Sequence, residues 1–230
     1  MKKGGRKTKV ETVIVSDIHL GVKFSRVEKL VEVLESYDFD RLILNGDIFN
    51  GLNFKRLNSE HWAVLSLFRH LSKYKEVVWI VGNHDGGASL MSRLLGINVH
   101  SEYMWQAGRK KCLAIHGHQF DRFMSEDPIL GKVAAALFII IKIFEGKNQF
   151  MTDLIKRHSH SWLRLSDEVA YKAIRYAKAK GANYVFCGHT HLARTLELYG
   201  IKYWNSGCWV EHPSHLITLK GEEVKLVQIK

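Results

Sequence analysis

The chain has 230 residues, of which 46% are hydrophobic and 25% are charged. This composition is that of a globular protein, so it excludes a fibrous or wholly disordered chain. Lys and Arg outnumber Asp and Glu by 34 to 23, which gives a formal net charge of +11. That excess favours an anionic partner, such as a phosphorylated small molecule, a nucleic acid or an anionic membrane surface.

Basic residues are concentrated at the N-terminus, where we expect residues 1–9 to form a disordered basic tail. No apolar segment of the signal-peptide type follows this tail. The three cysteines, Cys112, Cys187 and Cys208, form no C-x-x-C pair. The cysteines therefore predict a reducing, cytoplasmic compartment. The sequence contains no internal repeat and no low-complexity linker, so we expect a single domain over residues 10–230.

The first half of the chain alternates between strand and helix patterns. Short β-branched runs predict buried strands at 12–15, 41–44 and 77–81. Between them, apolar residues recur at helical spacing: Val27, Leu30, Val31 and Leu34, then Trp62, Leu65, Phe68 and Leu71. This β-α-β-α-β order predicts a mainly parallel sheet.

The second half begins with shorter alternating segments, including a hairpin around 107–108. Asp127 as an N-cap and Pro128 at the first helical position predict the start of a helical insertion at about 127–165. Its apolar run, 133–144, is shorter than the ~20 residues that span a bilayer. A last helix stops at Gly181, and four later segments predict a second, antiparallel sheet: 195–199, 202–204, 216–219 and 224–229.

Polar side chains that can bind metals follow the predicted strands, where α/β folds place their sites. In chain order they are Asp17, His19, Asp47, Asn83, His84, Asp85, His116, His118, His189 and His191. Each cluster alone also fits a capping residue, a turn or a hydrogen-bonded structural histidine.

The clusters together indicate a metal site, because the two members of a D-x-H or H-x-H pair leave an extended segment on the same side. Asp, Asn and His donors without a thiolate suit Mn²⁺, Fe²⁺ or Zn²⁺ with open coordination positions. Seven of the ten residues are good metal ligands, and seven are enough for two ions that share a carboxylate. A pair of ions suits phosphoryl transfer, and the positive charge would attract its polyanionic substrate.

The ordered motifs D-x-H, G-D, G-N-H-D, H-G-H and G-H-T-H resemble those of the calcineurin-like metallophosphoesterases, over residues 12–208. The resemblance implies an α/β (α+β) fold: a four-layer αββα sandwich of two mixed sheets with a helical insertion.

The same resemblance assigns roles to the motif residues. Asp17, His19 and His191 would hold one divalent ion, and Asn83, His116 and His189 the second. Asp47 would bridge the two ions, with Mn²⁺ expected first and Fe²⁺ or Zn²⁺ as alternatives. His84 would act as an acid or as a donor to the phosphoryl oxygen, with Asp85 orienting its ring.

Within the family, the motifs and the insertion look like the UDP-2,3-diacylglucosamine hydrolase branch, whose enzymes cleave a lipid A precursor to UMP and a lipid phosphate. The run 133–144 could then receive acyl chains, although an ordinary buried helix explains it nearly as well. Four residues are candidates for binding the diphosphate or anionic lipid head groups: His118, Arg157, His160 and Arg164. The basic run among them also fits a solvated helix face. This branch implies a cytoplasmic enzyme with peripheral contact to the inner membrane.

Two departures from the branch's pattern concern the substrate more than the metals. His84 follows Asn83 where an arginine can stand, and His118 stands where an aspartate is common. The alternative function is a phosphodiesterase or nuclease with the same ions, although the sequence shows no aromatic residues interleaved with basic ones as a stacking platform. A metal-free binding module would be expected to lose ligands, and all seven are present. The sequence leaves the oligomeric state open.

Overall fold

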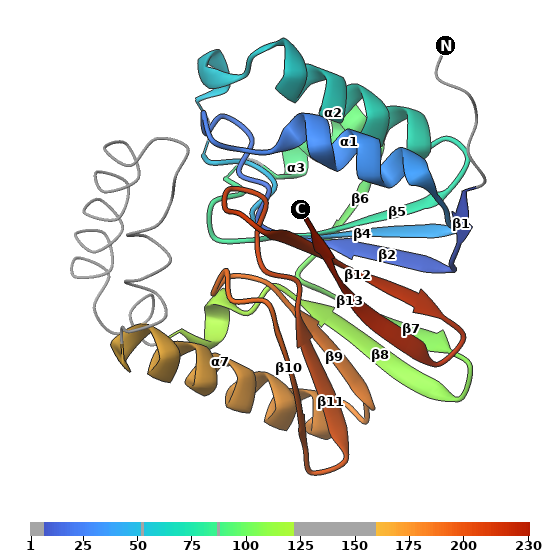
Figure 1. The fold of residues 1–230 in the computed structure, drawn as a ribbon, viewed down its shortest axis with the longest axis vertical. Coiled ribbons are helices and arrows are strands. Elements are labelled where there is room, and N and C mark those ends of the chain that lie inside the picture. Colours follow the sequence, from blue (N-terminus) through green and yellow to red (C-terminus); the bar gives the residue numbers. More distant parts are fainter. Residues whose placement is uncertain (1–6, 52, 87, 122–159) are drawn as a thin grey trace.

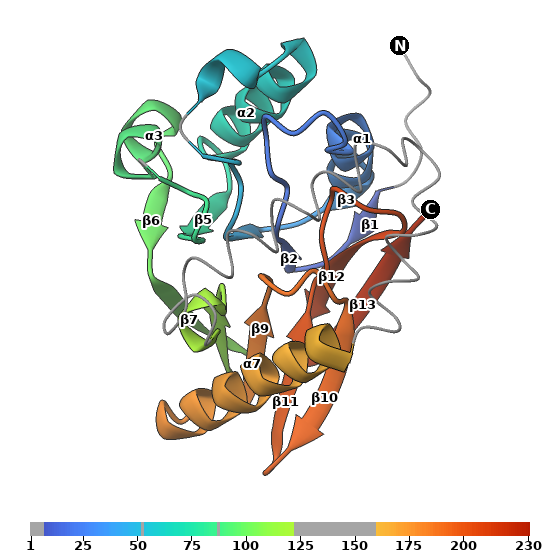
Figure 2. The same ribbon diagram turned by 90° about the vertical axis from the view of Figure 1, so that its left-hand side faces the viewer.

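The computed structural model describes residues 7–51, 53–86, 88–121 and 160–230 (Figure 1). Two β-sheets lie face to face, and helices cover the outer face of each sheet (Figures 1 and 2). This is the four-layer αββα sandwich that the motif resemblance implies.

The larger sheet has six strands in the order β13-β12-β2-β4-β5-β6. Four of them are parallel, as the alternating pattern predicted, and β12 and β13 are antiparallel additions at one side. Their bounds are β2 Thr12–Val15, β4 Arg41–Asn45, β5 Glu76–Ile80, β6 Asn98–His100, β12 Ser214–Lys220 and β13 Glu223–Ile229.

Three helices cover the outer face of this sheet: α1 Val27–Ser36, α2 Ser59–Leu71 and α3 Ala88–Leu95 (Figure 1). The Asn58 side chain caps α2 by accepting a hydrogen bond from the His61 backbone N–H at 2.9 Å. Leu30 and Phe68 are buried, as their helical spacing predicted. Trp62 is instead 50% exposed, because Val64 and Leu65 supply the inner face at this end of α2.

The smaller sheet has five strands in the order β10-β11-β9-β8-β7, and α7 (His160–Ala179) covers its outer face (Figure 1). The predicted hairpin is formed by β7 and β8. The bounds are β7 Glu102–Ala107, β8 Lys110–Ile115, β9 Tyr184–Cys187, β10 Arg194–Leu198 and β11 Ile201–Asn205.

The prediction that the four C-terminal segments form one antiparallel sheet is wrong. The β10–β11 hairpin joins the smaller sheet, which also contains parallel pairs of β8 with β9 and of β9 with β11. The β12–β13 hairpin joins the larger sheet beside β2. An alternating pattern indicates a strand, but it does not indicate which sheet edge the strand will pair with.

Three apolar clusters fill the spaces between the four layers. The middle cluster lies between the sheets and joins Ile14 and Ile43 from the larger sheet to Trp105, Phe186 and Trp204 from the smaller one. The outer clusters pack the larger sheet against its helices and the smaller sheet against α7. The two sheets are therefore locked together by buried apolar area.

Part of the N-terminal segment that was expected to be disordered forms a strand. Thr8–Lys9 form strand β1, which pairs with β3 (Tyr37–Asp38), so this part of the expected tail is ordered by backbone pairing. Most of the predicted insertion at 127–165, including Asp127, Pro128 and the run 133–144, lies outside the described residues. Among the helices that are described, none is long and apolar enough to cross a bilayer.

Candidate active site

The predicted clusters meet at one edge of the sandwich. The loops that follow β2, β4 and β5 of the larger sheet and β8 and β9 of the smaller sheet all leave at this edge, which faces the viewer in Figure 2. The carboxyl ends of parallel strands are the usual location of sites in α/β folds. Residues that are far apart in the sequence are therefore brought into contact here.

One group of donor atoms comes from Asp17, His19 and His191. The Nε2 atom of His191 lies 3.2 Å from Asp17 Oδ1 and 3.1 Å from His19 Nε2. Asp17 is fully buried, and its carboxylate also accepts the backbone N–H of His189. Three ligand atoms within 4.8 Å of one another form a candidate metal site.

A second group includes Asp47, His116, Asn83 and His189. Asp47 Oδ2 lies 3.4 Å from His116 Nε2 and 3.8 Å from His19 Nε2, so it lies between the two groups. Asn83 Oδ1 lies 3.1 Å from His189 Nδ1. All seven residues expected to be metal ligands therefore lie in one continuous cluster.

The separations of these atoms fit bound cations. Ligand atoms about 2.1 Å from a tetrahedral ion are about 3.4 Å from one another, close to the 3.1–3.4 Å separations of the closest donor pairs. Within the described part of the chain, the buried Nε2 atom of His116 has no hydrogen-bond partner. Such an atom costs free energy unless a cation or a proton donor satisfies it. The donor set therefore fits divalent ions.

The backbone of this edge is strained where the candidate ligands stand. Five residues have a positive φ between 51° and 67°: Asp17, His19, Asp47, His189 and His191. This left-handed region is uncommon for residues with a Cβ, and such strain is concentrated at functional sites. The strain is tolerated because buried strands fix both sheets directly below the loops.

Three glycines of the motifs allow side chains from other loops to approach the backbone closely. A Cβ on Gly82 would lie 2.2 Å from Asp47 Oδ1, and one on Gly188 would lie 2.4 Å from Asp17 Oδ2. A Cβ on Gly46 would lie 2.2 Å from His116 Nδ1. Each of these three glycines thus makes room for a candidate ligand supplied by a different loop.

The buried charges shift the pKa values of the histidines in opposite directions. Burial alone would lower the pKa of His116, but the adjacent Asp47 carboxylate outweighs it and raises that pKa to about 9. For His19 burial dominates and lowers the pKa to about 4. The charge of Asp47 thus favours a positive group at this position, either a proton on His116 or a bound cation that takes its place.

His84 lies at the mouth of this cluster. Its ring is exposed and packs edge-on against His19, with 5.2 Å between the ring centroids. Its backbone N–H donates to Asp47 Oδ1 at 2.8 Å, which ties its loop to the candidate bridging residue. The ring can thus reach a molecule that enters from solvent.

Asp85 does not orient the His84 ring, contrary to expectation. Its buried carboxylate accepts hydrogen bonds from the backbone N–H groups of Phe49 and Gly82 and from the indole of Trp79, at 2.9, 2.9 and 3.1 Å. Burial and the nearby Asp47 charge raise its pKa. Asp85 therefore braces the loop that presents Asn83 and His84.

The structure describes two of the four side chains that were expected to bind substrate, His118 and Arg164. His118 belongs to the short 3-10 helix His118–Phe120 beside the cluster, and its ring centroid is 5.4 Å from that of His116. Arg164 is exposed on α7. Arg157 lies outside the described residues, and so does the side chain of His160.

Three buried polar residues that support the cluster belong to none of the sequence motifs: Asn45, Asp121 and Glu211. The Asn45 carbonyl lies 2.9 Å from His116 Nδ1, and its side chain donates to Phe186 O across the two sheets. Asp121 Oδ2 lies 2.8 Å from His189 Nε2, and Glu211 Oε1 lies 3.6 Å from His191 Nδ1. Only the place of Asp121, five residues after His116, could have indicated a link to the site.

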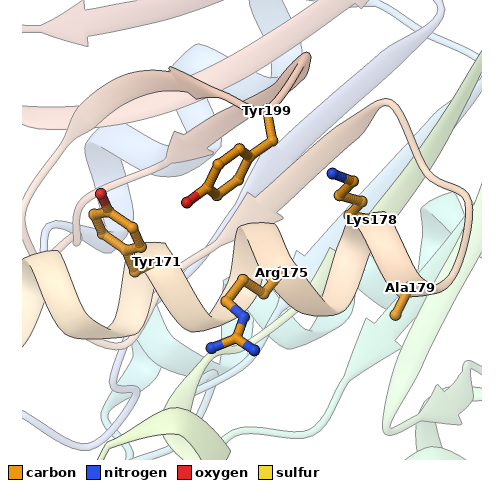
Figure 3. Close-up of a pocket in the computed structure, with 5 residues that line it drawn as sticks. All are labelled: Tyr171, Arg175, Lys178, Ala179 and Tyr199. Atoms are coloured by element: carbon orange, nitrogen blue, oxygen red, sulfur yellow. The ribbon is translucent and has the colours of Figure 1, made fainter.

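A surface pocket lies away from this edge, between α7 and the β10–β11 hairpin (Figure 3). Its volume is about 590 Å³, and it is lined by Tyr171, Arg175, Lys178, Ala179 and Tyr199. It contains none of the candidate ligands, so we do not place the chemistry there.

A family model for the calcineurin-like phosphoesterases matches residues 11–193 of the chain. The chain belongs to this family. Together with the donor cluster, the match makes the protein a metal-dependent phosphoester hydrolase. A search of the curated proteins found no match.

Solved structures share the fold at low sequence identity. An archaeal phosphodiesterase superposes with a TM-score of 0.55 and 14% identity, over 95% of this chain and 99% of its own. The E. coli phosphoesterase Yfce gives 0.52 and 15%, over 95% and 99%. A hypothetical protein from Pyrococcus horikoshii gives 0.56 and 12%, over 97% and 88%. At these identities the likeness establishes the fold alone.

Proposed function

We propose that the protein hydrolyses a diphosphate or phosphodiester bond with two divalent ions, Mn²⁺ first among them. Asp17, His19 and His191 would hold one ion, Asn83, His116 and His189 would hold the other, and Asp47 would be shared by both. The observation that carries this proposal is the position of Asp47 Oδ2, 3.8 Å from His19 Nε2 and 3.4 Å from His116 Nε2. A single carboxylate oxygen between two histidines of different groups suits a shared ligand.

Two bound divalent ions would polarise the phosphoryl oxygens and lower the pKa of a water molecule at the site. The chain itself supplies the proton donor. The exposed ring of His84, beside His19, is placed to donate a proton to the leaving group or a hydrogen bond to a phosphoryl oxygen. His118, whose ring centroid lies 5.4 Å from that of His116, is our candidate for contact with the second phosphate of a diphosphate.

For the substrate we propose UDP-2,3-diacylglucosamine, cleaved to UMP and 2,3-diacylglucosamine 1-phosphate. The support is the motif pattern and the insertion that the sequence predicts at 127–165, together with a net charge of +11 that favours an anionic lipid substrate. On this proposal the enzyme acts at the cytoplasmic face of the inner membrane, held there peripherally.

The substrate is tested by incubating the Mn²⁺-loaded protein with three compounds: UDP-2,3-diacylglucosamine, bis(p-nitrophenyl) phosphate and single-stranded DNA. We expect UMP from the first and slower release of nitrophenol from the second. Preferential cleavage of DNA would replace the lipid substrate with a nucleic acid. No hydrolysis of any of the three would overturn the catalytic proposal itself.

The membrane part is tested by sedimentation with vesicles that contain phosphatidylglycerol. Binding at low ionic strength that weakens as salt is added is expected, because exposed charges are screened beyond about 8 Å at 0.15 M salt. Protein that stays in the supernatant at low salt would contradict peripheral binding.

A further inference from the structure

His189 has a different partner on each side of its ring. Its Nδ1 atom faces the site, 3.1 Å from Asn83 Oδ1. Its Nε2 atom points away from the site, 2.8 Å from Asp121 Oδ2. Asp121 is 5% exposed and ends the turn that begins with the His118–Phe120 helix, so it is held in place by structure next to the site.

The carboxylate determines which ring nitrogen carries the proton. A carboxylate is an acceptor only, so the contact of 2.8 Å requires a proton on Nε2 of His189. In a neutral ring, this leaves a lone pair on Nδ1, directed at the site. That lone pair then faces Asn83 Oδ1, which is a second acceptor, and two acceptors 3.1 Å apart are satisfied together by a cation.

The other candidate ligands have weaker or different support at their outer nitrogens. His116 Nδ1 contacts the backbone carbonyl of Asn45 at 2.9 Å. Glu211 Oε1 lies 3.6 Å from His191 Nδ1, beyond hydrogen-bond distance. Among the described residues, Asp121 thus makes the shortest contact between a carboxylate and the outer nitrogen of a candidate ligand histidine.

A different arrangement would make the pair purely structural. If both nitrogens of His189 carried protons, the ring would form an ion pair with Asp121 and donate from Nδ1 to Asn83, and no cation could bind there. The two arrangements predict opposite states of Nδ1 in the presence of metal, so they can be distinguished by experiment.

We propose that Asp121 is a positioning residue, which fixes the tautomer and orientation of His189 so that Nδ1 can bind the second divalent ion. This inference rests on the proposed function, because it requires His189 to be a ligand. Carboxylate partners of this kind raise the basicity of ligating histidines, and their loss costs 10–100-fold in metal affinity.

The test compares wild-type protein with Asp121→Asn. The amide is nearly isosteric, but it can donate to Nε2 and so favour the tautomer with the proton on Nδ1. We expect Mn²⁺ titration by calorimetry to show a 10–100-fold weaker second site and an unchanged first site. Asp167→Asn on α7 is the matched control, because Asp167 is an exposed acid that pairs with Arg194 of β10 at 2.6 Å and contacts none of the candidate ligands.

A readout that does not depend on activity is the ¹⁵N shift of the His189 ring in protein with Zn²⁺ as a diamagnetic probe. We expect a proton on Nε2 and none on Nδ1 in the wild type, and a loss of this pattern in Asp121→Asn. If this variant fails to fold, the wild-type spectrum can still overturn the proposal, because a proton on Nδ1 of His189 would contradict it. A smaller variant, Asp121→Ser, repeats the titration with a neutral side chain.

The outcomes separate the two proposals. Two ions in the wild type with an unchanged second site in Asp121→Asn would overturn the role of Asp121. So would a proton on Nδ1 of His189 in the wild type with Zn²⁺ bound. A wild type that binds fewer than two ions would overturn the proposed function, and with it the role of Asp121.

Discussion

The two sheets contribute different chemistry to the candidate site. Among the seven candidate ligands, the larger sheet supplies both carboxylates, Asp17 and Asp47, and the amide of Asn83, whereas the ligands from the smaller sheet are all imidazoles. The negative charge that would contact the ions directly thus comes from one side, and the ligand nitrogens come mainly from the other. The site is complete only while the two sheets are packed together, and Asn45 links them directly below it.

The largest effect is expected from the shared carboxylate of the larger sheet. Asp47→Ala should lower kcat/KM at least about 10³-fold, since both ions lose a ligand worth several kcal/mol. His116→Ala, on the smaller sheet, should weaken the second ion and spare the first. Metal analysis of the two variants measures this difference. Loss of both ions from His116→Ala, as from Asp47→Ala, would contradict it.

The next effect concerns His84, which we propose as a proton or hydrogen-bond donor rather than a metal ligand. His84→Ala should lower kcat by ~10²–10⁴-fold while the metal content stays at the wild-type level. The reason is that its exposed ring contacts His19 but does not belong to either donor group. Loss of an ion from this variant would show that His84 is a ligand.

The close approach of the two sheets is tested by adding one methyl group. Gly188→Ala would place a Cβ 2.4 Å from Asp17 Oδ2, so we expect weaker metal binding and a loss of about 1–3 kcal/mol in unfolding free energy. Gly181→Ala is the matched control, because its Cβ would meet nothing within 4 Å and it costs only the strain of a positive φ, about 1–2 kcal/mol. Metal affinity that falls equally in both variants would argue against a specific clash.

The smallest effect is expected where strain lies outside the site. Tyr199 has a φ of 53° in the β10–β11 turn, and Lys178 Nζ lies 5.1 Å from its ring centroid. Tyr199→Asn should relieve about 1 kcal/mol of strain and lose about 0.5 kcal/mol of cation–π attraction, for a net gain of about 0.5 kcal/mol. Thermal unfolding should show the gain, and kcat should not change. A loss of stability would mean that the Tyr199 ring contributes more than its strain costs.

Much of the site was predictable, because each motif stands directly after an apolar run. Parallel strands with short loops bring their carboxyl ends to one edge, so Asp17, Asp47 and His189 could be placed together before any contact was known. The pairing of β12 with β2 could not be predicted, since it depends on which sheet edge remains free after the other strands have paired.

Residues that act through others gave little sequence signal. Asp85 adjoins His84, yet its carboxylate turns towards Trp79 and Phe49, and only the folded loop determines that direction. Asn45 and Asp121 lie outside every motif, and only the five-residue distance of Asp121 from His116 links either of them to one. Their contacts depend on the packing of one sheet against the other, which is a tertiary property.

The number of divalent ions bound per chain tests the central claim most directly. After dialysis against Mn²⁺ and removal of free metal, elemental analysis of the wild-type protein should give two ions per chain. Treatment with EDTA should abolish hydrolysis, and added Mn²⁺ should restore it. One ion or none per chain, with hydrolysis unaffected by EDTA, would contradict the account.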